Sequence, residues 1–365
     1  MGHMPPRAET RRRRAAGLRQ RALGALCATV LAGCGAGLSS ASEAADRGAT
    51  EESTTRAESS PDGSTRTSED PAAADRSTED GVDDEAALGI GDDYFPDSGN
   101  PGYDVASYDL VLDMDDDLVG FEAVATIALR TTEDLDELRF DLDGLTVTTA
   151  TIDGKKVEQR RAGLDLVLTP EAPLPADEPV VVIVDYEGTP EPRGSDTLGE
   201  LGWIGEPGVG SYVASEPDGA SNWFPANDHP SDKATFSFEV TTPEGVEAVA
   251  NGTRTGMKTE GGRTTWTWSP RDPMATYLAT VAVGQYTFFE GTAPGGIPLL
   301  SAVADEVVEA SGKTEVEAML GQLPAMMTLF AGRFGPYPFE TYGILVVDRP
   351  LGFALETQTR SLFGS

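Results

Sequence analysis

The chain has 365 residues, with 27 Lys and Arg against 61 Asp and Glu, and a formal net charge of -34. This acidity excludes nucleic acid as a partner, because binding of phosphates needs a basic surface. There are only two histidines, His3 and His229, so the chain alone cannot complete a zinc site that needs several histidine ligands.

The first 34 residues have the order of an export signal. Residues 1–22 contain seven Arg and one Glu, and the apolar segment Ala22–Gly33 follows. That segment is too short to span a bilayer. It ends in Leu31-Ala32-Gly33-Cys34, which resembles the lipobox of bacterial lipoproteins and implies cleavage before Cys34 and lipidation of its sulfur. We therefore expect an exported protein anchored by lipid to the outer face of a bacterial cytoplasmic membrane. An ordinary secretory signal with an incidental cysteine is the alternative.

Residues 35–92 consist mainly of Ser, Thr, Glu, Asp, Ala, Gly and Arg and have almost no large apolar side chains. Such a composition cannot bury enough surface to fold. The sequence predicts a disordered acidic tether between the anchor and the folded region.

Residues 93–290 are predicted to form one β domain of many short, mainly antiparallel strands. Apolar residues alternate along several segments, and the continuous run Val180–Val184 suits a strand buried on both faces. Turn signals such as Asn251-Gly252 and Gly261-Gly262 separate the segments. The alternating positions are Phe121, Ala123, Ala125, Ile127 and Leu129, then Leu138, Phe140 and Leu142, and later Phe236, Phe238 and Val240. Trp223, Trp266 and Trp268 are expected in the core.

Residues 291–365 change character. Apolar spacings of three and four predict helix over residues 305–334, divided or capped at Gly312 and Pro324, and a strand follows at Gly343–Val347. This pattern is expected of the incomplete beginning of an α+β domain.

Three stretches resemble the aminopeptidase N family of zinc metallopeptidases, the gluzincin aminopeptidases. They are EPDGASNWFPANDHPSDKATF at Glu216–Phe236, DPMATYLATVAVG at Asp272–Gly284, and GFALETQ at Gly352–Gln358, at the place of the family's Gly-x-Met-Glu-Asn motif. The resemblance covers roughly residues 94–365. It implies a saddle-like N-terminal β domain, then the start of a thermolysin-like catalytic domain, and a zinc-dependent release of N-terminal residues from peptides.

By this resemblance, Glu216 and Glu356 anchor the α-ammonium group of a peptide substrate. A carboxylate attracts a free ammonium group but not a neutral internal amide, so it selects the chain end. Strand alternation puts Gly352, Ala354, Glu356 and Gln358 on one face, where the small residues leave room for a peptide. The edge of this strand is able to pair with substrate backbone.

The sequence also departs from the family pattern. Ala354-Leu355-Glu356-Thr357 stands where the family has its Met-Glu-Asn core, and no His-Glu-x-x-His zinc motif occurs in the 365 residues. We expect zinc in the full-length relative and none bound by this chain, which is predicted to be inactive alone. A non-catalytic, lipid-anchored surface protein whose β domain binds peptide or protein is the alternative function.

Three other features have plain structural interpretations. His229 is not expected to bind metal, because it has no partner at metal-ligand spacing. Asp228 and Lys233 are expected to form an ion pair that braces a turn. The acidic run Asp113–Asp117 lacks the pattern of an EF-hand and is expected to be a solvated turn.

Overall fold

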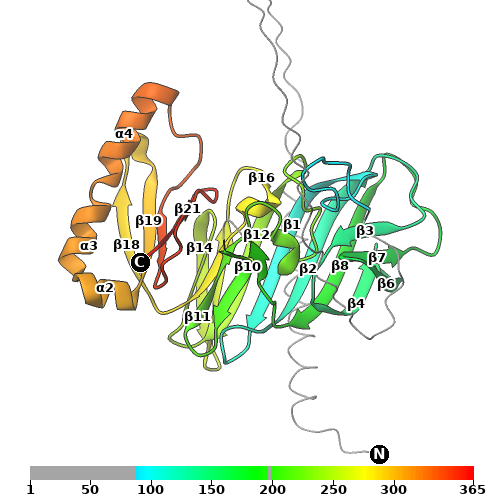
Figure 1. The fold of residues 1–365 in the computed structure, drawn as a ribbon, viewed down its shortest axis with the longest axis horizontal. Helices are drawn as coiled ribbons and strands as arrows, with labels where there is room; N and C mark the ends of the chain where they lie inside the picture. The colour runs from blue at the N-terminus through cyan, green and yellow to red at the C-terminus, as the bar shows by residue number, and fades with distance from the viewer. Residues whose placement is uncertain (1–87, 196–198) are drawn as a thin grey trace, which may run out of the picture.

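A computed structural model of the chain describes residues 88–195 and 199–365. The predicted signal with Cys34, and almost all of the predicted tether 35–92, lie outside these residues. The described part is mainly β, as predicted, and its sheets are built mostly from antiparallel strands, with three α-helices near the C-terminal end (Figure 1). None of the helices within the described ranges has the length and apolar character needed to cross a lipid bilayer.

The largest sheet has nine strands in the order β14-β15-β12-β1-β2-β8-β4-β5, with β16 paired to β12. Its strands are β1 (Tyr103–Met114), β2 (Phe121–Thr131), β4 (Thr146–Ile152), β5 (Lys155–Lys156), β8 (Pro179–Gly188), β12 (Lys233–Pro243), β14 (Thr253–Glu260), β15 (Arg263–Ser269) and β16 (Met274–Ala275). The predicted alternation sets its register, since apolar Leu110 and Leu112 pair with Ala125 and Ala123. β1 and β12 are parallel, which is an exception to the antiparallel pattern.

Two smaller sheets complete the β domain. One has the order β13-β17-β11-β10-β9 and the other β3-β7-β6. The strands are β3 (Leu138–Asp141), β6 (Glu158–Ala162), β7 (Asp165–Thr169), β9 (Arg193–Ser195), β10 (Gly199–Glu206), β11 (Gly210–Ala214), β13 (Glu247–Ala250) and β17 (Val281–Gly284), with short 3-10 turns η1 (Ala220–Asn222) and η2 (Thr276–Leu278). Trp223, Trp266 and Trp268 are buried in the core, as predicted.

The C-terminal part is a five-stranded sheet with the order β18-β19-β20-β22-β21. Figure 1 shows this sheet between the β domain and helices α2, α3 and α4. The elements are β18 (Tyr286–Thr292), η3 (Pro294–Gly296), β19 (Pro298–Ala304), α2 (Asp305–Ser311), α3 (Lys313–Leu320), α4 (Leu323–Phe334), β20 (Ile344–Val347), β21 (Ala354–Leu355) and β22 (Ser361–Gly364). Gly312 separates α2 from α3, and Pro324 lies in the first turn of α4, as the spacing predicted.

One prediction about the sheets was wrong. Val180, Val182 and Val184 are buried, but Val181 and Ile183 are only half-buried. β8 therefore has one fully buried face and one partly open face, because antiparallel sheets commonly leave one face toward solvent.

The prediction of a solvated turn for the acidic run Asp113–Asp117 holds only in part, because Asp116 and Asp117 are exposed in a turn but Asp113 is not. Asp113 is buried and forms an ion pair with Arg263, while one Asp117 oxygen accepts hydrogen bonds from the backbone N–H groups of Val119 and Gly120. These bonds fix the turn between β1 and β2.

Candidate amine-recognition site

Glu216 lies just after β11, on a loop that leads into η1. Its side chain is exposed, and it borders a hollow of about 280 Å³ together with Tyr94, His229, Tyr277 and other residues. Carboxylates of Asp92, Asp218 and Asp228 also line this hollow. The combination of acidic and aromatic walls suits a small organic cation.

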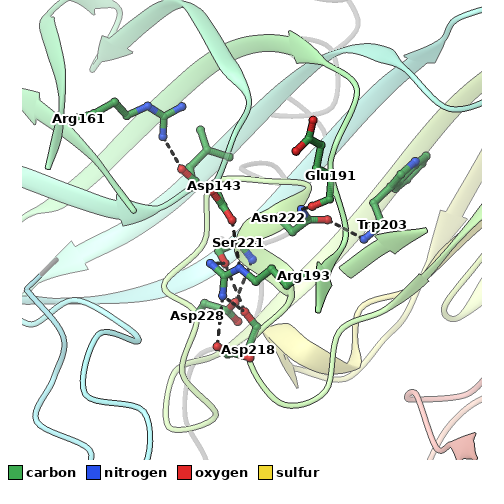
Figure 2. Close-up of polar contacts among 10 residues, drawn as sticks. Asp143, Arg161, Glu191, Arg193, Trp203, Asp218, Ser221, Asn222 and Asp228 are labelled. Carbon is green, nitrogen blue, oxygen red and sulfur yellow. Dashed lines mark hydrogen bonds and ion pairs between the residues drawn. The ribbon is translucent and has the colours of Figure 1, made fainter. Parts of the chain in front are cut away.

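Arg193 fixes the loop that carries Glu216 through contacts with Asp218 and Ser221. Its guanidinium group lies 3.1 Å from Asp143, 3.2 Å from the Asp218 carboxylate and 3.2 Å from the Ser221 hydroxyl oxygen (Figure 2). One planar fork therefore ties three segments together, which is the geometry for which arginine is suited. The loop that carries Glu216 is fixed at its base.

Asn222 fixes the other end of the loop against β10. Its side-chain oxygen accepts a 2.7 Å hydrogen bond from the backbone N–H of Trp203, and its amide nitrogen donates to the Glu191 carbonyl oxygen at 2.7 Å (Figure 2). This close approach requires Gly202, where φ is +89° and an added Cβ would lie 2.4 Å from the Asn222 oxygen.

Asp228 is buried and is not paired with Lys233, so the predicted ion pair is wrong. Its carboxylate accepts hydrogen bonds from the Ser221 N–H at 2.9 Å and the Thr276 hydroxyl at 2.8 Å. The Asp228 N–H donates in turn to the Asp141 carboxylate at 2.8 Å. The exposed Lys233 does not reach this interior position. Asp228 braces the loop, but through buried hydrogen bonds.

Burial raises the pKa values of two aspartates that support the Glu216 loop, Asp141 and Asp228. Burial and the neighbouring Asp228 raise the pKa of Asp141 to about 8, and burial raises the pKa of Asp228 as well. Two carboxyl groups this close together inside a protein are not both ionised easily. Burial and the Glu216 carboxylate also raise the pKa of the Tyr277 hydroxyl, which therefore stays protonated at neutral pH.

His229 has contacts that suit a structural residue. Its Nδ1 lies 2.8 Å from the Ser231 hydroxyl oxygen and its Nε2 lies 3.4 Å from Asp92. Among residues 88–195 and 199–365, no three His, Cys, Asp or Glu side chains are grouped so that they could hold a metal ion. The described residues therefore do not fit the zinc ion that the family resemblance implies.

Glu356 follows β21, which forms one edge of the C-terminal sheet. Ala354 and Glu356 are exposed while Leu355 is buried, as alternation predicted. Gly352 is also exposed, but it precedes β21 in a bend with φ of +73° and is not part of the strand. The prediction fails at Gln358, which is buried and donates to the Asp272 carbonyl oxygen at 3.1 Å. The strand ends at Leu355, and the chain then turns into the β domain.

Glu356 borders a second hollow, of about 420 Å³, whose other walls are largely apolar side chains of α4 and the segment after it. Glu216 lines the first hollow and Glu356 the second, so the two predicted anchors belong to separate hollows. Sequence reasoning did not single out Tyr277 as a wall of the Glu216 hollow. Its signal was present, because Tyr277 lies within the second of the three stretches that carry the family resemblance.

The fold and this acidic hollow define a protein with a carboxylate-bearing β domain joined to a small α+β unit. Comparison with known proteins identifies the family that this β domain matches. Residues 105–278 match the family described as the peptidase M1 N-terminal domain.

A solved structure of the M1 zinc metallopeptidase from Deinococcus radiodurans is similar to the chain. The two have a TM-score of 0.67 and 30% sequence identity, and the match covers 75% of this chain and 63% of the peptidase. A mutant of the same peptidase bound to a Tyr-Ser-Ala substrate has a TM-score of 0.66 and 31% identity, with coverage of 75% and 63%.

Among curated proteins, aminopeptidase A of Gloydius brevicauda is 36% identical over 101 residues, which is 26% of this chain and 10% of that protein. Glutamyl aminopeptidase of Bitis rhinoceros is 36% identical over 111 residues, or 29% and 11%. Residues 105–278 thus match the N-terminal domain of the M1 peptidases, which confirms the predicted resemblance to the N-terminal region of the aminopeptidase N family. It spans less than two thirds of the length of these relatives.

Proposed function

We propose that this chain is the N-terminal portion of a zinc-dependent aminopeptidase that releases N-terminal residues from peptides. The observation that carries the proposal is the exposed Glu216, held on a braced loop in a β domain of this family. The related peptidase with a bound Tyr-Ser-Ala substrate supports a peptide ligand.

Glu216 and Glu356 would together hold the substrate's α-ammonium group. Each is exposed and able to meet a cation. Because Glu216 borders one hollow and Glu356 another, a shared anchor requires the substrate's amino group to lie between the two hollows. A free amino terminus gains Coulomb attraction from both carboxylates, whereas an acylated one gains none. The exposed edge strand β21 offers backbone groups to an extended peptide.

A zinc ion in the complete enzyme would activate water and polarise the scissile carbonyl group. The described residues of this chain do not supply its ligands. Their part in the proposed function is to bind and orient the amino terminus.

The test uses the protein expressed from the complete gene and an aminoacyl arylamide substrate. Glu216→Gln and Glu356→Gln should each raise KM about tenfold or more, because each removes one charge from the amine anchor; tenfold corresponds to about 1.4 kcal/mol. Glu158→Gln is the matched control, since Glu158 is an exposed glutamate on β6. Retention of selectivity for free over N-acetylated substrate in both anchor variants would show that the assignment is wrong.

The 365-residue chain is assayed beside the complete gene product. It is expected to release no arylamine. If it bound one zinc ion per chain and cleaved the substrate, the view that it is only a portion of the enzyme would have to be abandoned.

We also propose export and lipid anchoring through Cys34, on the basis of the charged, apolar and small-residue order of residues 1–34. Cys34→Ser should abolish incorporation of labelled palmitate and release the protein from the membrane fraction. Cys27→Ser is the control, because Cys27 lies inside the signal. Equal labelling of the Cys34→Ser protein would contradict the proposal.

A further inference from the structure

Arg360 lies completely buried in the seam between the β domain and the C-terminal sheet. Its guanidinium group donates to three carbonyl oxygens on both sides of the seam. Nη2 donates to Gly252 at 3.0 Å, Nε to Ala250 at 3.4 Å, and Nη1 to Leu300 of β19. One side chain thus joins the turn after β13 to the C-terminal sheet.

Arg360 takes part in none of the ion pairs found among the described residues. Its positive charge is instead stabilised by carbonyl oxygens and by an aromatic ring. Its guanidinium carbon lies 5.2 Å from the centroid of the Trp268 ring. Burial lowers the Arg360 pKa to about 10, so the group remains protonated at neutral pH. Burying a cation costs far more than burying an apolar side chain of similar size. What the arginine adds is a planar fork with fixed directions.

The turn that ends in Arg360 begins directly after Glu356. The Arg360 N–H donates to the Thr357 carbonyl oxygen at 3.1 Å, and the Thr357 hydroxyl donates to the Arg360 carbonyl oxygen. The Thr359 hydroxyl oxygen accepts the Gly252 N–H at 2.6 Å. Hydrogen bonds therefore hold residues 357–360 against the β domain, and Glu356 directly precedes this fixed segment.

We propose that Arg360 is a positioning residue for Glu356, which sets where that carboxylate stands relative to Glu216. The inference rests on the proposed function, in which the two glutamates form one amine anchor. Glu216 belongs to the β domain and Glu356 to the C-terminal unit, so their separation is fixed at the seam that Arg360 crosses. A small change at the seam moves one glutamate relative to the other.

The first test measures this separation directly. Spin labels are attached to Glu216→Cys and Glu356→Cys in a full chain that also carries Cys27→Ser and Cys34→Ser. Pulsed electron paramagnetic resonance should give one narrow distance distribution with Arg360 present. Arg360→Met, which keeps length and apolar volume, should widen that distribution about twofold or more. Arg360→Lys keeps the charge but not the planar guanidinium group, so it should give a distribution of intermediate width. This variant still tests the inference if the methionine variant does not fold.

Arg349→Met is the matched control. Arg349 also bridges the two parts, through an ion pair of 2.6 Å with Glu206. Although Arg349 is close to Glu356 in sequence, this ion pair is on the surface and its partner Glu206 lies on β10, outside the Glu356 turn. The control variant should leave the distance distribution unchanged. Unchanged distributions in both Arg360 variants would overturn the inference.

The second test uses the product of the complete gene and asks whether Arg360 acts through Glu356. Arg360→Lys should raise KM severalfold in the presence of Glu356 and have no further effect in the Glu356→Gln background. Additive effects would assign Arg360 a general structural role and refute positioning. If neither glutamate variant alters KM while the label distances still respond to Arg360, the amine anchor fails and the positional role of Arg360 stands.

Discussion

The guanidinium group of Arg360 lies over the ring of Trp268, 5.2 Å from its centroid, and both side chains are fully buried. The indole N–H of Trp268 donates to the Ala248 carbonyl oxygen at 3.1 Å, so the ring itself is held in place. This pairing puts a cation on an aromatic face where water is excluded, which strengthens the attraction. The C-terminal unit is thereby joined to the β domain at a defined point.

Asn251 should be as important for this seam as Arg360. Its amide nitrogen donates to the Gln358 carbonyl oxygen at 2.7 Å and to the Leu278 carbonyl oxygen at 2.9 Å, and its oxygen accepts the Thr280 N–H at 2.7 Å. Asn251→Ala leaves these buried groups without partners, so the free energy of unfolding should fall by about 1–3 kcal/mol or more. Urea denaturation measures the change. A loss below about 0.5 kcal/mol would mean that water replaces the side chain and that the seam does not depend on it.

The contribution of Asp141 to the stability of the chain should decrease as pH rises from about 4 to about 8. Burial raises the folded-state pKa of Asp141 to about 8, above the value of about 3.9 for an unfolded aspartate. The folded state therefore binds the proton more tightly. Its stabilising effect is complete below the unfolded pKa and is lost as pH rises through the folded pKa.

Asp141→Asn should flatten this part of the pH profile. The slope removed should approach 1.4 kcal/mol per pH unit at most. Unfolding free energies from urea titrations at pH 5, 6, 7 and 8 provide the measurement. Asp97→Asn is the control, because Asp97 is exposed and its substitution should leave the profile unchanged. An identical slope in the Asp141→Asn protein would exclude Asp141 as the source.

How far the sequence predicted this structure depends on the range of the interactions involved. The alternation at Phe236, Phe238 and Val240 is local, and it correctly predicted the buried face of β12. The state of Asp228 is not local, because its partners include Ser221 on η1, Thr276 on η2 and Asp141 on β3. Because these distant partners cannot be identified from the sequence, the sequence alone predicts an ion pair between Asp228 and the nearby Lys233.

The candidate site shows the same limit. The motif around Glu356 predicted its exposed face up to that residue. Gln358, however, is held by hydrogen bonds with Asn251 and Asp272, which are 107 and 86 positions earlier in the chain. Family resemblance identified Glu216 and Glu356 separately. That they border different hollows follows only from packing of the two units.

Gly202→Ala should disrupt the support of the Glu216 loop. The residue has φ of +89°, and an added Cβ would meet the Asn222 side chain at 2.4 Å. The expected loss is about 1–2 kcal/mol for the left-handed backbone and about 1–3 kcal/mol for the overlap. Gly208→Ala separates the two causes, since its φ is +78° and its surroundings are open. Thermal unfolding should rank the proteins wild type, Gly208→Ala and Gly202→Ala; equal losses in both variants would show that the contact with Asn222 relaxes freely.

Helix α4 exposes a row of large apolar side chains that should drive self-association of the chain. Leu329 is 59% exposed, Phe330 57% and Phe334 84%. Exposed apolar patches of this kind promote association. Leu329→Glu combined with Phe330→Glu should shift the chain toward monomer in sedimentation velocity at high concentration and leave its thermal midpoint nearly unchanged. Ala325→Glu with Thr328→Glu adds the same charge to exposed positions of the helix without removing these side chains, so an equal shift in that control would attribute the effect to charge repulsion and not to the apolar row.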